Sequence, residues 1–113
     1  MPESKISARL VLTTMVNPEE AARLGRMLVE ERLAACVQLI PGTQSIYHWQ
    51  GVIEESVETL LLIKTGPEQL KALEARLHEL HSYETPEFLV LDVDSGSRKY
   101  LDWLHTCLEP ACG

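Results

Sequence analysis

The sequence predicts an α+β domain in which two helices cover one face of an antiparallel sheet. Apolar runs of strand length alternate with two segments that repeat apolar residues at helical spacing. Turn residues such as proline, glycine and asparagine separate these runs. The resulting order, β-α-β-β-α-β followed by a C-terminal helix, is that of the ferredoxin-like sandwich. Since a chain of 113 residues suits one domain, we expect a single domain over residues 1–113, with residues 109–113 as a loose tail.

The first strand and the first helix are predicted within residues 8–33. Residues 8–15 are apolar and β-branched without clean alternation, which is typical of a central strand covered on both faces. Asn17 can cap a helix, and Pro18 is favoured at the first helical position. We expect this helix to end near Arg32 and to bury the apolar side formed by Ala21, Leu24, Leu28 and Val29.

The middle of the chain predicts a long antiparallel hairpin. Residues 34–40 form an apolar run that suits a second buried strand, and the proline–glycine pair at 41–42 marks a turn or kink. Residues 44–50 and 52–65 predict the two strands that meet at Gly51. We therefore expect the hairpin to be long and to be bulged or split.

The second helix, the last strand and a closing helix are predicted after residue 65. Thr65, Pro67 and Glu68 supply a cap, a first-turn proline and an early acid. The helix that follows is expected to bury the leucines at helical spacing, which are Leu70, Leu73, Leu77 and Leu80. Residues 88–93 predict a strand, and residues 98–108 predict a short helix after a serine- and glycine-containing turn.

Composition argues against several classes of partner. The net charge of −7 disfavours binding to a phosphate backbone, which calls for a basic face. The sequence shows neither a secretory leader nor an apolar run of the roughly 20 residues that a membrane helix needs. Three cysteines, Cys36, Cys107 and Cys112, have no metal-binding or redox spacing and suggest free thiols. We expect a cytoplasmic protein with no nucleic-acid or membrane partner.

An oligomer is predicted from the strands that are apolar on both faces, residues 34–40 and 60–63. Two helices cover only one face of a sheet, so the other face needs a second layer. A second copy of the chain would supply that layer, and so would the C-terminal helix. We favour the oligomer.

The polar segment between the second helix and the last strand is the strongest candidate site. It contains His81, Tyr83, Glu84 and Glu87 within seven residues. Side chains at such a junction can converge on a cleft that rigid elements hold in place. Polar residues at a junction also occur in ordinary solvated loops, so both interpretations stand.

The chain resembles the CutA divalent-cation-tolerance family from about residue 10 to 105. The matching motifs, in order, are Glu31-Arg-Leu-Ala-Ala-Cys-Val37, Ile40-Pro-Gly42, Ser45-Ile-Tyr-His-Trp-Gln-Gly51, Ile63-Lys-Thr65, His81-x-Tyr83-Glu84-x-Pro86-Glu87 and Tyr100-Leu-x-Trp-Leu104. The resemblance implies a compact homotrimer of ferredoxin-like subunits, similar in architecture to the PII signalling proteins. It also implies an association with copper and other divalent cations.

Metal binding through His81 is what the resemblance implies most directly, with Glu84 and Glu87 as nearby oxygen donors. The chain departs from the pattern of some members at two positions, because Thr13 replaces a cysteine and Leu80 replaces a second histidine. A serine, Ser82, stands where a proline often follows the histidine. Nearby His78 is either a substitute ligand or an exposed helical histidine.

A small-molecule pocket is the alternative. Lys64 comes just before a helix start, which suggests an anion site. Tyr47, Trp49, Tyr83 and Glu84 are candidates to line a cleft between subunits, although Tyr47 and Trp49 also suit a trimer core.

The sequence contains no Ser/His/Asp ordering, phosphate-binding glycine loop or CxxC pair, so we expect no enzyme activity. We predict a homotrimeric CutA-type protein that binds copper or another divalent cation, with His81 as the metal ligand. The alternative is a PII-like trimeric sensor of a small molecule, or a signalling scaffold, with Lys64 in its binding site.

Overall fold

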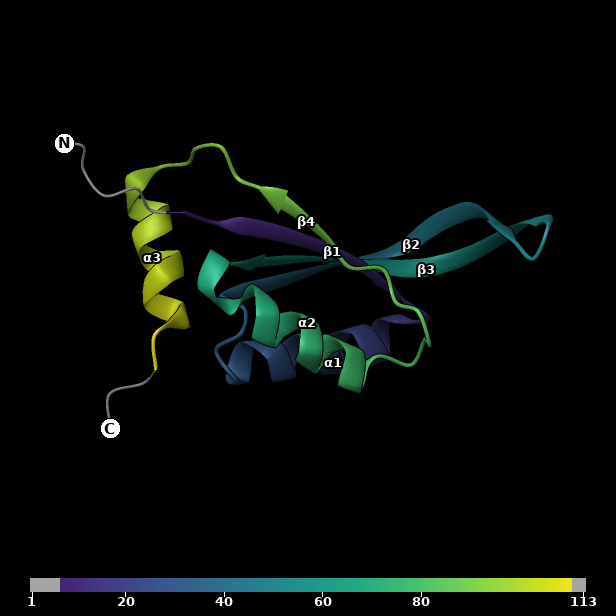
Figure 1. Cartoon of the computed structure of the whole chain (residues 1–113), viewed down its shortest axis with the longest axis horizontal. Helices are drawn as coiled ribbons and strands as arrows, with labels where there is room; N and C mark the ends of the chain where they lie inside the picture. Colours follow the sequence, from purple (N-terminus) through teal and green to yellow (C-terminus); the bar gives the residue numbers. More distant parts are fainter. Residues whose placement is uncertain (1–6, 111–113) are drawn as a thin grey trace.

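The computed structural model describes residues 7–110 and confirms the α+β sandwich. Two helices lie on one face of a four-stranded antiparallel sheet whose order is β2-β3-β1-β4 (Figure 1). The elements in chain order are β1 (Arg9–Met15), α1 (Pro18–Glu30), β2 (Cys36–Trp49), β3 (Val52–Thr65), a 3-10 turn η1 (Pro67–Gln69), α2 (Leu70–Leu80), β4 (Leu89–Asp92) and α3 (Arg98–Leu108). Among the described residues, every helix is too short or too polar to span a bilayer.

Helix α1 begins as predicted and ends earlier than expected. The Asn17 side chain accepts a 2.8 Å hydrogen bond from the Glu20 backbone N–H, which caps the first turn. The helix ends at Glu30, and Arg32 takes a left-handed conformation with φ of 62°. Val29 was predicted on the buried side, but it is 39% exposed. It directly follows the buried Leu28, and consecutive helical residues point in different directions around the helix axis.

Strand β2 is one continuous strand, where the sequence suggested two. The register with β3 shifts between Ile40 and Thr43, and Gly42 there has a φ of 74°. This β-bulge is the irregularity expected at the proline–glycine pair. The last residue of β1, Met15, pairs with Thr59. Residues 43–58, which we call the hairpin arm, therefore extend as two strands beyond β1 (Figure 1).

The start of α2 differs from the prediction. The Thr65 hydroxyl does not cap the helix; it donates a 2.7 Å hydrogen bond to the backbone oxygen of Leu33. A 3-10 turn over Pro67–Gln69 precedes α2, which begins at Leu70 without a side-chain cap. Thr65 is fully buried on the helix-facing side of β3, so its hydroxyl is used to tie β3 to the end of the α1 segment.

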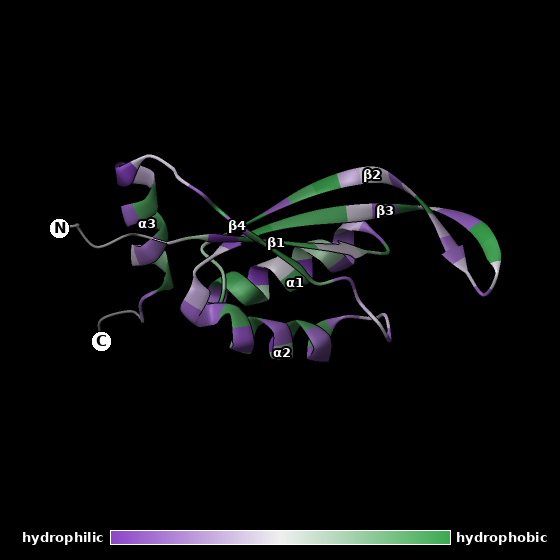
Figure 2. Ribbon diagram, turned by 45° about the horizontal axis from the view of Figure 1, so that its top comes forward, coloured by the Kyte–Doolittle hydropathy of each residue, from purple (hydrophilic) through white to green (hydrophobic). Residues whose placement is uncertain are grey.

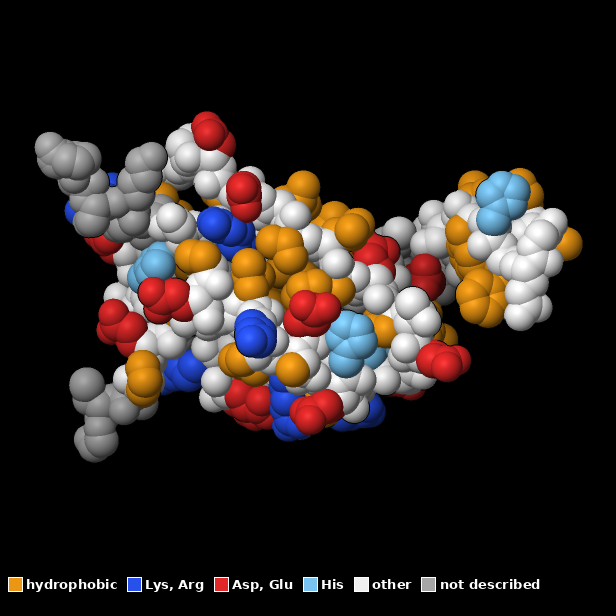
Figure 3. All heavy atoms as spheres, in the orientation of Figure 1, with side chains coloured by type: hydrophobic (Ala, Val, Ile, Leu, Met, Phe, Trp, Pro, Cys, Tyr) orange, Lys and Arg blue, Asp and Glu red, His pale blue; other side chains and the backbone are white. Residues whose placement is uncertain are grey.

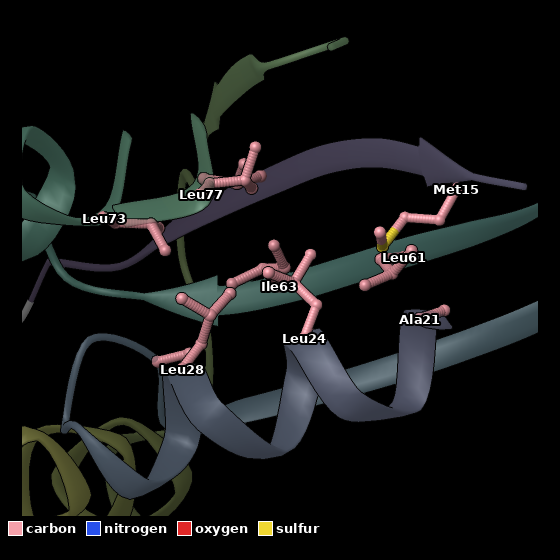
Figure 4. Packing of buried hydrophobic residues seen from close by; sticks show 10 residues of the cluster. Met15, Ala21, Leu24, Leu28, Leu61, Ile63, Leu73 and Leu77 are labelled. Carbon is pink, nitrogen blue, oxygen red and sulfur yellow. The ribbon is translucent and has the colours of Figure 1, made fainter. Parts of the chain in front are cut away.

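The core lies between the sheet and the two helices (Figure 4). Strand β3 contributes Leu61 and Ile63, which are completely buried. Helices α1 and α2 cover them with side chains that are at most 2% exposed, namely Ala21, Leu24, Leu28, Leu73 and Leu77. The predicted helical stripes thus form one packed layer on one face of the sheet.

The opposite sheet face, which we call the outer face, remains largely uncovered. By strand alternation it carries a leucine-rich surface formed by Leu10, Leu12, Leu60, Leu62, Leu89 and Leu91. Helix α3 covers only one end, where Leu104 and Leu108 pack against Ala8 and Ala35. Figure 2 shows hydrophobic colouring that continues along the strands beyond α3.

The hairpin arm is apolar on both faces. Ile46, Ile53 and Val57 are 64%, 64% and 65% exposed on one face, and Trp49 and Val52 are exposed on the other. Hydrophobic side chains are visible on the projecting arm in Figure 3. The radius of gyration is 15.4 Å, whereas a compact chain of this length has about 13 Å. An isolated two-stranded hairpin is only marginally stable in water, so the arm needs further contacts.

Candidate functional site

His81 is held by hydrogen bonds at both ring nitrogens. It follows the last residue of α2 and is 8% exposed. The Tyr83 backbone N–H donates to Nδ1 at 3.0 Å, so Nδ1 is the acceptor. Nε2 therefore carries the proton and donates to the Thr14 backbone oxygen at 2.7 Å. The two bonds fix the tautomer and attach the polar segment to the end of β1.

Tyr83 links this segment to the base of the hairpin arm. Its hydroxyl donates a 2.7 Å hydrogen bond to Oε2 of Glu58, and its ring lies 4.8 Å from the His81 ring, centroid to centroid. Burial raises the pKa of Tyr83 well above its ordinary value, and the hydrogen bond to Glu58 raises the pKa further. The phenol is thus held in its neutral form between an imidazole and a carboxylate.

Tyr47 lies on the arm near this cluster, and Trp49 lies farther out. The Tyr47 hydroxyl is 3.4 Å from Oγ of Ser56, and its proximity adds to the raised pKa of Tyr83. Trp49 is 58% exposed, next to the tip. Neither aromatic ring is buried within one chain, so their expected place in a trimer core stays a prediction.

The remaining candidates do not join the cluster within one chain. Glu84 is exposed and Glu87 is half-buried, and among the described residues neither forms a hydrogen bond or an ion pair through its side chain. Lys64 lies six residues along β3 from Glu58, roughly 20 Å at strand spacing. Its Nζ donates to the Tyr100 hydroxyl at 3.5 Å, on the outer face beside α3. Within one chain Lys64 is therefore separate from Tyr83, and the predicted cleft between subunits stays a prediction.

Sequence reasoning missed two partners in this region. The structure places the Glu58 carboxylate on the Tyr83 hydroxyl. Tyr100 was noted only as part of a helical motif, yet it contacts Lys64 from 36 residues away. Residue alternation on β3 could have placed Glu58 and Lys64 on one face, but it could not identify either partner.

The donors of a single chain do not fit a complete metal shell. Within residues 7–110 there is no group of three or more His, Cys, Asp and Glu side chains arranged to hold an ion. The Nδ1 lone pair of His81 already accepts the Tyr83 N–H. His78 is exposed on α2 and uses its Nδ1 at the Glu74 backbone oxygen, 2.8 Å away. Thr13 is buried in the core and offers no thiolate to an ion.

The Tyr83→Phe variant is expected to lose less stability than the unsubstituted protein as the pH rises above about 10. The pKa of Tyr83 is raised in the folded state, so its stabilising contribution is complete below the unfolded pKa. It is lost as the pH rises from that value toward the folded pKa, because the unfolded phenol ionises first. Urea unfolding at pH 8 and pH 10.5 measures this difference. Tyr100→Phe, at an exposed tyrosine, is the control, and an equal alkaline loss in all three proteins would contradict the expectation.

The fold and the cluster together define a ferredoxin-like protein with a projecting hairpin arm and a histidine–tyrosine–glutamate cluster at the base of that arm. The CutA1 divalent ion tolerance protein family matches residues 9–107. The divalent-cation tolerance protein CutA of Thermus thermophilus is 47% identical over 95 residues, which are 84% of this chain and 92% of that protein. This chain therefore belongs to the CutA1 divalent ion tolerance family.

Solved structures agree with this assignment. The structure of the periplasmic divalent cation tolerance protein CutA from Archaeoglobus fulgidus superposes with a TM-score of 0.87 at 31% identity, covering 90% of this chain and 99% of that one. A chloroplastic CutA of Arabidopsis thaliana is 40% identical over 84% of this chain and 52% of that protein. Because the compartments of these two relatives differ, the cytoplasmic location of this chain stays a prediction.

Proposed function

We propose that this chain acts as a homotrimer in tolerance to divalent cations, and that it binds copper or another divalent cation without turning over a substrate. The proposal that the chain assembles rests on the uncovered apolar surface of the outer face and of the hairpin arm. Ile40, Leu89 and Leu91 on the outer face are 44%, 57% and 47% exposed. Surfaces of this kind usually mark contacts with another protein chain.

The sheet edges favour a ring over a two-fold dimer. Strand β2 forms one edge and β4 forms the other, and they differ in length, with 14 and 4 residues. Pairing unlike edges gives a head-to-tail contact, and such contacts close into a ring where the rotation between copies is a whole fraction of a turn, and otherwise form an open filament. The long β2 of one copy would cover the short β4 of the next, which also removes two exposed strand edges.

The cation would bind at His81, with the rest of its shell supplied across a subunit boundary. The bond from Nε2–H to the Thr14 backbone oxygen supports this assignment, because metal-binding histidines usually donate their second nitrogen to such an acceptor. Nδ1 is then the nitrogen that would face an ion. Since the Tyr83 N–H now occupies Nδ1, binding requires residues 82–84 to move.

A calorimetric titration of copper(II) into the metal-free protein, with thiols kept reduced, tests the site. We expect saturable binding at a fixed number of ions per subunit and a loss of affinity of at least about tenfold in His81→Gln. The matched control is His78→Gln, which removes an exposed imidazole three residues away.

Circular dichroism and sedimentation first establish that both variants fold and assemble as the unsubstituted protein does. If copper shows no saturable heat, or if His81→Gln binds it as tightly as the unsubstituted protein does, His81 is not a ligand.

A further inference from the structure

A pocket of about 250 Å³ lies between α3, the connection that leads to it from β4, and the paired ends of β1 and β3. Its wall is mainly apolar and includes Leu10, Val93, Leu101 and Leu104. Lys64 also lines the pocket, and its positively charged ammonium group has no acidic partner among the described residues. The pocket thus combines an apolar interior with one charged group, which is the usual composition of a small-ligand site.

The ammonium group of Lys64 is held in place, but its charge is not neutralised. Its Nζ lies 3.5 Å from the Tyr100 hydroxyl and 5.6 Å from the centre of that ring. Among residues 7–110 it forms no ion pair. One of its three N–H groups points to Tyr100, which leaves donors for a ligand. Because Tyr100 accepts from Lys64, its own hydroxyl proton is also available to donate.

Arg9, the other cationic residue that lines the pocket, already has partners for its guanidinium group. The Arg9 guanidinium contacts the Asp92 carboxylate at 3.0 Å and also donates to the Ala8 backbone oxygen. The pocket therefore offers one uncommitted positive charge. Arg98, in the first turn of α3, is likewise committed, because its Nε lies 3.6 Å from the Asp102 carboxylate.

Size and charge together select the ligand. A volume of about 250 Å³ falls below the roughly 300–1,000 Å³ typical of sites for drug-sized ligands, so a nucleotide is too large. A doubly charged phosphate would bring a second negative charge into an apolar pocket without a partner, which is unfavourable. A single carboxylate matches the single ammonium, and an apolar tail matches the leucines.

We propose that this pocket binds a small monocarboxylate with an aliphatic or aromatic tail, whose carboxylate accepts from Lys64 and Tyr100 and whose tail packs against Leu101 and Leu104. The site is separate from His81. Lys64 lies opposite Leu10, whereas His81 is bonded to Thr14, four residues along β1 and roughly 13 Å away at strand spacing. The proposal does not depend on cation binding, and the failure of one leaves the other standing.

Titration with sodium hexanoate, followed by calorimetry and by the methyl NMR signals of Leu101 and Leu104, tests the proposal on the assembled, metal-free protein. We expect saturation at one hexanoate per subunit, with both leucine signals shifting along the same curve. Lys64→Met keeps the length and the apolar stem of the side chain but removes the charge. It is expected to weaken hexanoate binding by about tenfold or more.

Three controls separate the carboxylate site from general adsorption. Lys71→Gln removes an exposed lysine on α2 and should leave the affinity unchanged. Tyr100→Phe removes only the hydroxyl and should weaken binding less than Lys64→Met does. Hexanol and inorganic phosphate should each bind at least about tenfold more weakly than hexanoate.

The proposal is overturned if hexanoate gives no saturable shift, if hexanol binds equally well, or if a correctly assembled Lys64→Met protein keeps the original affinity.

Discussion

The double variant Leu89→Lys/Leu91→Lys is expected to be monomeric at micromolar concentration, whereas we expect the unsubstituted protein to sediment at three times its chain mass of 12.7 kDa. Both leucines lie on the outer face of β4, opposite Leu12 and Leu10 of β1. In the proposed ring this surface becomes buried, and two lysines there would be desolvated without partners. Within one chain the same side chains are half exposed, so the subunit itself should still fold. Sedimentation velocity measures the mass, and circular dichroism confirms the fold.

A matched control places two lysines on the side of the sheet that the helices cover. Ala22→Lys/Val29→Lys changes two exposed apolar residues of α1, on the opposite side of the sheet from the outer face. This variant is expected to remain trimeric. A monomeric mass for the unsubstituted protein would disprove the trimer. A trimeric mass for the β4 variant would place the subunit contact elsewhere.

The order of elements could be predicted because each one follows its own period. Leu24 and Leu28 repeat at helical spacing, as do Leu73 and Leu77, and all four are buried in the core. The errors arise where tertiary contacts compete with local signals. Thr65 stands where the sequence predicts a helix cap. Its hydroxyl instead donates to the Leu33 backbone oxygen, because the end of β3 lies beside the loop that follows α1. A bulge at Gly42 lets β2 continue where the sequence suggested a break.

The candidate site could be located from sequence but its contacts could not. The polar segment drew attention to His81 and Tyr83, and the structure does bring these rings together. Their strongest partners are the Thr14 backbone oxygen and the Glu58 carboxylate, 67 and 25 residues away. A backbone carbonyl carries no side-chain signal, so no residue pattern identifies it. The place of Lys64 beside Tyr100 depends in the same way on where α3 crosses the sheet.

Leu61→Ala is expected to lower the free energy of unfolding by about 3 kcal/mol, a large part of the 5–15 kcal/mol typical of a domain. Leu61 is completely buried on β3, among the side chains that α1 and α2 place over the sheet. Removing its isobutyl group leaves a cavity that this rigid layer can fill only in part. The measurement is urea unfolding followed by circular dichroism.

The monomeric β4 variant is the right background for this measurement, because assembly otherwise makes the apparent stability depend on protein concentration. Leu62→Ala is the matched control there, since Leu62 is the next residue of β3 but points to the outer face, where it is only half-buried. In a monomer, Leu62→Ala should lower the free energy of unfolding clearly less than Leu61→Ala does, because a half-exposed side chain transfers less surface from water on folding.

In the trimeric protein, the loss of unfolding free energy from Leu62→Ala should grow toward that from Leu61→Ala, since the proposed contact buries the outer face. Equal losses in the monomer would show that the outer face is already covered within one chain. An unchanged loss on assembly would show that Leu62 lies outside the subunit contact.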